Sequence, residues 1–127
     1  MSTPDCYIVS IKHTRRDQPY ITFWRPEAKG YAWPLSWAAR YSEAEVLAER
    51  NYYHRGDDTL AVPCMLVDAL AVPPAHGMID NNAGPVVLNN RTNWKCLLEF
   101  ALPDPLYKPE PQYKGARRKL TTPLPGA

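Results

Sequence analysis

Alternating apolar and polar positions near the start of the chain predict two paired strands. In Tyr7–His13 every second residue falls on one face, with Tyr7, Val9 and Ile11 on the same side, which is the period of a strand. Tyr20–Trp24 follows a short polar stretch and is rich in β-branched and aromatic residues, so it predicts a second strand. The loop between them is too short for a crossover, and we expect an antiparallel hairpin.

A third strand is predicted after a turn at Pro26–Gly30. Proline fixes its own φ, and glycine accepts the positive φ that a tight turn often requires. Tyr31–Leu35 then has the composition of an extended segment. Because Pro34 cannot donate a hydrogen bond to a neighbouring strand, this strand should lie at an edge of the sheet or end there.

Three helices are predicted further along the chain. Ser42 begins the capping-box sequence S-E-A-E, and the helix that it caps should run to about Arg50. The apolar residues of Cys64–Leu70 fall on one face of a second helix. Asn89 or Asn90 can cap a third helix, in which apolar residues recur at helical spacing. These apolar positions are Trp94, Leu97, Leu98 and Ala101.

Together these elements predict an α+β fold, with a small antiparallel sheet of three or four strands and two or three helices packed on one face. Thr59–Val62 and Pro85–Leu88 are further short extended segments. The chain has 14 prolines, which are densest after Leu102. We therefore expect one globular domain over residues 1–102 and a Pro-rich basic tail over residues 103–127 that is extended or disordered.

Composition and charge exclude some classes of protein. The chain has 127 residues, the size of one domain, and a net charge of +2, which is too small to imply a nucleic-acid or membrane partner by itself. No signal peptide and no apolar run of membrane-spanning length is present. Cys6, Cys64 and Cys96 are isolated, as in proteins with free thiols. These features predict a cytoplasmic protein without a membrane partner.

Three segments in the first third of the chain together carry a resemblance. They are YIVSIKHT at Tyr7–Thr14, ITFWRPEAKGYAWP at Ile21–Pro34 and WAARYS at Trp37–Ser42. This ordered set resembles the N-terminal pattern of small uncharacterised proteins of tailed bacteriophages and prophages. The chain departs from that pattern at Ala39, where glycine is frequent. The resemblance implies a phage origin and a setting in the host cytoplasm, and it implies no reaction.

Aromatic and basic residues interleave in the same region and provide candidate binding residues. On a sheet surface such residues can stack bases and neutralise phosphates. Alternatively, the rings form the core and the basic groups form a solvated rim, with Arg25 over a ring in a cation–π contact. We favour the core role, because a small body needs most of its aromatic area inside. The candidates are Trp24, Arg25, Tyr31, Trp33 and Arg40.

The tail supplies a second group of candidate binding residues. It contains five basic and two acidic residues, and its basic run includes Lys114, Arg117, Arg118 and Lys119. Such a run can bind nucleic acid or an acidic protein surface. It can equally serve as a mobile end that aids solubility, and the sequence leaves both interpretations open.

One short stretch has the residue types of a catalytic site. His54, Asp57 and Asp58 lie within HRGDD, and a histidine with two carboxylates can bind a divalent ion or act as acid and base. We favour a polar loop in which Gly56 turns the chain. The histidines and cysteines lack metal-ligand spacing, and no common catalytic motif is present, so we expect no metal and no cofactor.

These observations favour a binding protein over an enzyme. The leading hypothesis is a phage-type accessory protein that acts by non-catalytic binding to a host protein. One alternative is a nucleic-acid-binding module that uses the aromatic–basic stretch and the tail. A second alternative is a small metal-dependent hydrolase or nuclease. The sequence does not indicate an oligomeric state.

Overall fold

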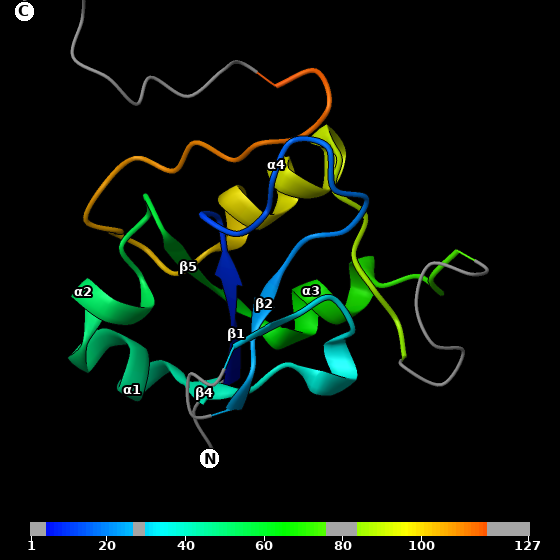
Figure 1. The fold of residues 1–127 in the computed structure, drawn as a ribbon. Helices are drawn as coiled ribbons and strands as arrows, with labels where there is room; N and C mark the ends of the chain where they lie inside the picture. The colour runs from blue at the N-terminus through cyan, green and yellow to red at the C-terminus, as the bar shows by residue number, and fades with distance from the viewer. Residues whose placement is uncertain (1–4, 27–29, 76–83, 117–127) are drawn as a thin grey trace, which may run out of the picture.

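The computed structural model describes residues 5–26, 30–75 and 84–116. Within these ranges the chain forms short strands and short helices around one long central strand (Figure 1). The strands are β1 (Asp5–Ser10), β2 (Phe23–Trp24), β3 (Tyr31–Ala32), β4 (Tyr41–Ser42) and β5 (Thr59–Pro63). The helices are the 3-10 helix η2 (Leu35–Trp37) and the α-helices α1 (Glu43–Ala48), α2 (Arg50–Tyr53), α3 (Cys64–Leu70) and α4 (Arg91–Phe100).

Strand β1 is the centre of the sheet and has antiparallel partners on both of its edges. Strand β5 pairs with it from Cys6↔Pro63 to Ser10↔Thr59. Cys6 is also paired with Tyr41 of β4, and Val9 is also paired with Phe23 of β2. Because a strand residue has one partner on each edge, β4 and β2 lie one after the other on the edge opposite β5. Strand β3 then pairs with β2 and forms the outer edge of the sheet.

The predicted α+β class is confirmed, and the sheet and its antiparallel hairpin are present. Two helices, α3 and α4, pack on one face as predicted, and α1 packs on the other face in addition, so residues Cys6–Ser10 of β1 are buried on both faces. On one face Tyr7 and Val9 join a core cluster with residues of α3 and α4, whereas on the other Cys6 and Ile8 join a cluster with Val46 of α1. The sheet has five strands.

Two predicted strands end earlier than their composition indicates. Strand β1 stops at Ser10 rather than His13, since the amides of Ile11 and Lys12 both donate to the carbonyl of Asp58. Strand β3 stops before Pro34, which cannot continue the ladder. The chain just before β2 therefore pairs with a different segment: the amide of Ile21 donates to the carbonyl of Val87 at 2.9 Å.

The helix starts follow the predicted caps. The Ser42 hydroxyl accepts from the amide of Glu45, and the Glu45 carboxylate accepts from the amide of Ser42, which completes the capping box. Asn90 caps α4 through its side chain. The first helical region is interrupted at Glu49, whose φ of −133° is not helical, and resumes as α2.

Residues 103–116 of the tail contain no helix or strand and lie along the body (Figure 1). The amide of Tyr107 donates to the carbonyl of Arg55 at 2.7 Å. The Arg16 guanidinium donates to Gln112 and to the carbonyl of Ala116. Gly56 has a φ of +94°, and a Cβ at this position would lie 1.8 Å from the Tyr107 carbonyl oxygen. The tail therefore passes the Gly56 turn at a distance that only glycine permits.

Candidate functional site

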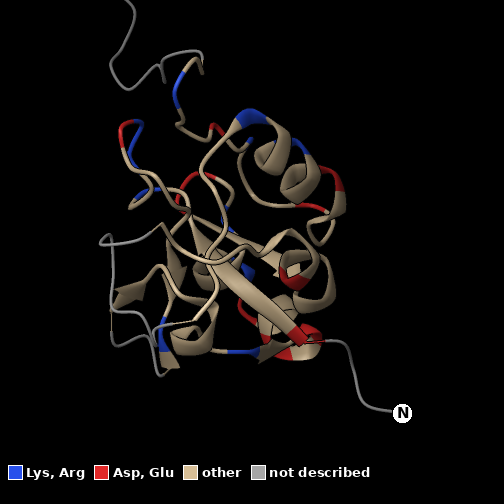
Figure 2. Ribbon diagram, turned by 90° about the vertical axis from the view of Figure 1, so that its right-hand side faces the viewer, with Lys and Arg blue, Asp and Glu red and all other residues tan. Residues whose placement is uncertain are grey.

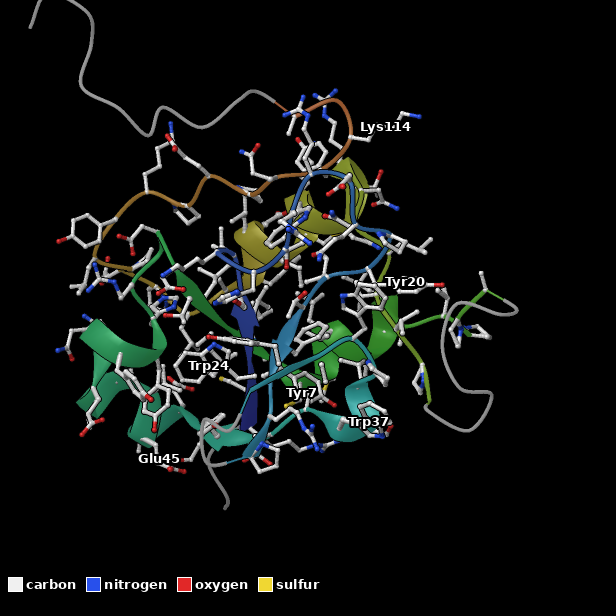
Figure 3. All side chains as sticks on the ribbon, in the orientation of Figure 1. Tyr7, Tyr20, Trp24, Trp37, Glu45 and Lys114 are labelled. Carbon is white, nitrogen blue, oxygen red and sulfur yellow. The ribbon has the colours of Figure 1, made fainter. Side chains whose placement is uncertain are left out.

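Trp24, one of the candidate binding residues, belongs to the core. It is 8% exposed and packs edge-on against the rings of Tyr52 and Tyr53, with centroids 5.0 and 5.9 Å away. Figure 3 shows Trp24 beside α1 and α2, whereas Tyr20 and Trp37 lie on the other side of the molecule in that view. The ring of Trp24 is therefore covered and does not offer a surface to a partner.

Tyr31 and Trp33 lie elsewhere, in an open hollow of about 340 Å³ that we call the aromatic hollow. Its exposed rings are Tyr31, which is 47% exposed, and Trp37, which is 45% exposed. Trp33 is half-buried between them and the core. The aromatic hollow is lined by His13, Gln18, Thr22, Tyr31, Ala32, Trp33, Pro34 and Trp37.

Ring contacts hold the walls of the aromatic hollow in place. The His13 imidazole lies against the Tyr31 ring with centroids 3.9 Å apart. Trp33 packs edge-on against the buried Tyr20 ring at 5.3 Å, and the Tyr20 hydroxyl accepts from the amide of Ala75. These contacts join residues that are distant in sequence, so the hollow is shaped by the fold before any partner arrives.

Arg25 and Arg40 occupy different surroundings. The Arg25 guanidinium lies 5.7 Å from the centroid of the Trp37 ring, which places it at the rim of the aromatic hollow. Arg40 instead lies over the Tyr7 ring at 5.6 Å and is 3.9 Å from the carboxylate of Asp68. The Tyr7 hydroxyl donates to Asp68 at 2.8 Å, and burial, with help from this hydrogen bond, raises the pKa of Tyr7 to about 12. Arg40 therefore covers the core and does not line the aromatic hollow.

Lys114 lies in a second hollow, of about 540 Å³, which we call the basic hollow. It is lined by Arg16, Asp17, Gln18, Pro19, Asn89 and Lys114. Because Gln18 lines both hollows, they are neighbours on one surface. Figure 2 shows several Lys and Arg residues gathered where α4 begins and the described part of the tail ends. The other tail candidates, Arg117, Arg118 and Lys119, lie outside the described residues.

The structure does not bring His54 into a site with Asp57 and Asp58. His54 is fully buried; its Nδ1 accepts from the amide of Ala61 at 3.0 Å, and its Nε2 donates to the carbonyl of Leu102 at 2.7 Å. Burial lowers the pKa of His54 below its ordinary value of 6.5. The ring is therefore neutral at pH 7, and both of its nitrogens are occupied by structural hydrogen bonds.

The two aspartates lie at the surface and have other partners. Asp57 accepts two hydrogen bonds from the Arg55 guanidinium, at 3.0 and 3.2 Å. Both aspartates line a third, polar hollow to which His54 does not contribute. Among residues 5–26, 30–75 and 84–116, no three histidine, cysteine, aspartate or glutamate side chains form a group that could hold a metal ion. This geometry supports the polar-loop interpretation of HRGDD.

Sequence reasoning missed the residues that complete the aromatic hollow, chiefly His13, Gln18 and Trp37. His13 was assigned to a strand face, yet it follows the end of β1 and turns towards Tyr31. Trp37 is carried by η2.

The chain matches no protein-family model, no curated protein and no solved structure. In the part of the chain that the structure describes, no helix is both long and apolar enough to cross a membrane.

Proposed function

We propose that this chain is a non-catalytic binding protein and that its contact surface is the aromatic hollow. The observation that supports the proposal is the half exposure of Tyr31 and Trp37 around a hollow whose walls are fixed by ring contacts. Other large aromatic side chains, such as Tyr7, Tyr20 and Phe23, are fully buried. Tyr52, Phe100 and Tyr107 are exposed to a similar degree, so what distinguishes Tyr31 and Trp37 is that they line one hollow together with Trp33.

The chemistry of the aromatic hollow suits a protein partner. Tryptophan, tyrosine and arginine are the residue types that most often dominate binding energy at protein interfaces, and Tyr31, Trp37 and Arg25 supply one of each here. A volume of about 340 Å³ is at the small end of the range of roughly 300–1,000 Å³ for ligand sites. It can receive one or two side chains. The resemblance to phage proteins makes a host protein the expected partner.

A nucleic-acid-binding module is the second candidate, and the shared residue Gln18 favours it. Bases can stack on the exposed rings of the aromatic hollow while phosphates contact Arg16 and Lys114 in the neighbouring basic hollow. No lysine or arginine lines the aromatic hollow itself, so this mode requires a strand that spans both hollows. For that reason the protein partner is the first candidate.

A capture experiment with matched variants tests the proposal. The full chain, its Trp37→Ala variant and its Phe100→Ala variant are immobilised and exposed to bacterial lysate. Phe100 is the control because it is also half exposed, at 53%, but lies at the end of α4. We expect a protein that the wild type and Phe100→Ala retain and that Trp37→Ala loses. Equal retention by all three would remove the aromatic hollow as the contact surface.

The same three proteins separate the two candidates. Binding of a single-stranded oligonucleotide is measured at low and at moderate salt. If phosphates contact Arg16 and Lys114, affinity falls steeply as salt increases, and Trp37→Ala weakens the binding that remains. Absence of oligonucleotide binding at low salt would eliminate the nucleic-acid candidate.

A further inference from the structure

The backbone groups of Thr22, just before β2, and the carbonyl of Trp24, within β2, direct their hydrogen bonds away from β3. The Thr22 carbonyl accepts from the Ser10 amide at 2.8 Å, and the Thr22 amide donates to the Thr14 hydroxyl at 2.9 Å. The Trp24 carbonyl accepts from the Ala39 amide at 2.9 Å. None of these partners belongs to β3. In an antiparallel pair, residues alternate between hydrogen-bonded and non-hydrogen-bonded positions, so Trp24 occupies a non-hydrogen-bonded position opposite β3.

The same alternation fixes the direction of the β3 backbone. Trp24 faces Tyr31 and Phe23 faces Ala32 in the register of the two strands, and Trp33 comes directly after the end of β3. Ala32 therefore directs its amide and carbonyl towards β2. Tyr31 directs its amide and carbonyl outwards, away from the sheet, and the amide and carbonyl of Trp33 make no hydrogen bond with another described residue. Within the described ranges, β2 is the only strand that pairs with β3.

This free edge is short and lies beside the aromatic hollow. At one end of β3, the backbone amide of Arg25 donates to the Gly30 carbonyl at 2.9 Å. At the other end the chain turns away at Pro34, and the amide of Leu35 donates to the carbonyl of Pro85 at 2.8 Å. Tyr31 and Trp33, which carry the backbone groups of this edge, also contribute rings to the hollow. Backbone donors and acceptors and an apolar depression are thus available at one place.

We propose that an extended segment of a partner protein adds to β3 as a further strand, bonded to the backbone of Tyr31 and Trp33, and places an apolar side chain in the aromatic hollow. This inference rests on the proposed function and specifies its partner and mode. Strand addition combines backbone hydrogen bonds with pockets that receive alternate side chains. A polynucleotide lacks the regular amide donors and acceptors that such an edge pairs with, which favours a peptide.

Arg25 adds a preference for a negatively charged residue in the partner segment. Its guanidinium lies over the Trp37 ring, 5.7 Å from the ring centroid, and makes no ion pair with another residue of the described ranges. The guanidinium therefore has no carboxylate partner among the described residues and can donate its N–H groups to a carboxylate of a partner. The expected segment is therefore extended, carries a large apolar residue and has an aspartate or glutamate within reach of Arg25.

Amide hydrogen exchange of the free full chain tests the edge itself. By NMR, we expect the Ala32 amide to exchange at least about tenfold more slowly than the amides of Tyr31 and Trp33, because only Ala32 is bonded to β2. Equal protection of all three amides would show that the edge is already occupied and would overturn the inference.

Binding is tested with peptides selected from a random twelve-residue display library on the full chain. We expect the selected peptides to slow exchange of the Tyr31 and Trp33 amides and to bind Trp37→Ala at least about tenfold more weakly. N-methylation of the peptide amides that face β3 should weaken binding at least about tenfold, whereas methylation of the intervening amides should change it by less than about threefold.

The outcomes distinguish the two levels of the proposal. If binding depends on Trp37 but neither amide protection nor N-methylation follows the alternation, strand addition is wrong and the aromatic hollow remains the contact surface. If the peptides bind Trp37→Ala as tightly as the wild type, both proposals fail. If no peptide is selected and a twelve-nucleotide single strand binds through Trp37, the nucleic-acid candidate replaces them.

Discussion

The close passage of the tail over Gly56 leads to a quantitative prediction about stability. Replacing Gly56 with alanine has two costs. The first is strain at a φ of +94°, roughly 1–2 kcal/mol for a residue with a Cβ. The second arises because the new Cβ would lie 1.8 Å from the Tyr107 carbonyl oxygen, so residues around Tyr107 must move away from the body.

The second cost can be estimated from the contacts that this movement breaks. They are the hydrogen bond from the Tyr107 amide to the Arg55 carbonyl, at 2.7 Å, and the stacking of Arg55 on the Tyr107 ring, at 5.2 Å. A hydrogen bond contributes about 1 kcal/mol and an exposed cation–π contact about 0.5–1 kcal/mol. We therefore expect Gly56→Ala to cost about 2 kcal/mol more than strain alone.

Gly30→Ala is the matched control, because Gly30 has a φ of +108° and no atom of the described residues lies within 4 Å of the position of a Cβ. It should show the strain without the clash. In thermal unfolding, about 2 kcal/mol corresponds to a melting temperature about 8 °C below that of the control for a chain of this size. Urea titration of both variants gives the free energies of unfolding directly.

A truncated chain that ends at Leu102 completes the test. Without the Tyr107 segment, Gly56→Ala and Gly30→Ala should destabilise the shortened chain equally. The same truncation tests the predicted boundary between a domain over residues 1–102 and a tail over residues 103–127, since the loss of the Arg55 and Arg16 contacts should lower stability. Equal effects of the two substitutions in the full chain would refute the close passage of the tail over Gly56.

Two further predictions concern buried polar groups. Burial lowers the pKa of His54 below its ordinary value of 6.5 in the folded state, so the unfolded chain binds the proton more readily. The free energy of unfolding should therefore fall as pH decreases below about 6.5, by at most about 1.4 kcal/mol per pH unit. Urea titrations between pH 5 and 7.5 measure this, and a slope that His54→Gln leaves unchanged would assign the effect to another group. Asn89→Ala should lower the free energy of unfolding by about 1–3 kcal/mol. The substitution removes the side-chain oxygen that accepts from the buried Trp94 indole N–H at 2.6 Å, and the side-chain NH2 group that donates to the carbonyls of Arg15 and Gln18. Asn93→Ala, which loses one side-chain bond to Leu88, is the control; an equal cost for both would contradict the role of Asn89.

Features that depend on residues close together in the chain could be predicted from the sequence. The capping box at Ser42, the end of β3 before Pro34 and the buried stripe of Trp94 and Leu97 all involve groups within a few residues of each other. A hydrogen bond between neighbouring residues, a missing amide or a helical period has the same meaning in any fold. The α+β class follows from the sum of such features.

The functional surface depends on contacts that local patterns do not record. The sequence suggested Trp24, Tyr31 and Trp33 equally, because all three are aromatic residues at strand positions. The fold buries Trp24 under the rings of α2 and leaves Tyr31 beside His13 at an open hollow. Which ring is covered depends on the elements that pack above it, and helices on both faces of β1 decided this.

The amino-acid sequence by itself determined the elements, their caps and the supply of aromatic, basic and titratable side chains. Tertiary structure alone decided that His54 is buried, that residues 103–116 lie along the body and that, within the described residues, no strand pairs with the edge of β3 beside the aromatic hollow. The physical reason is distance along the chain. Contacts such as Tyr20 with Trp33, or Gly56 with Tyr107, arise only when the whole sheet and its helices assemble.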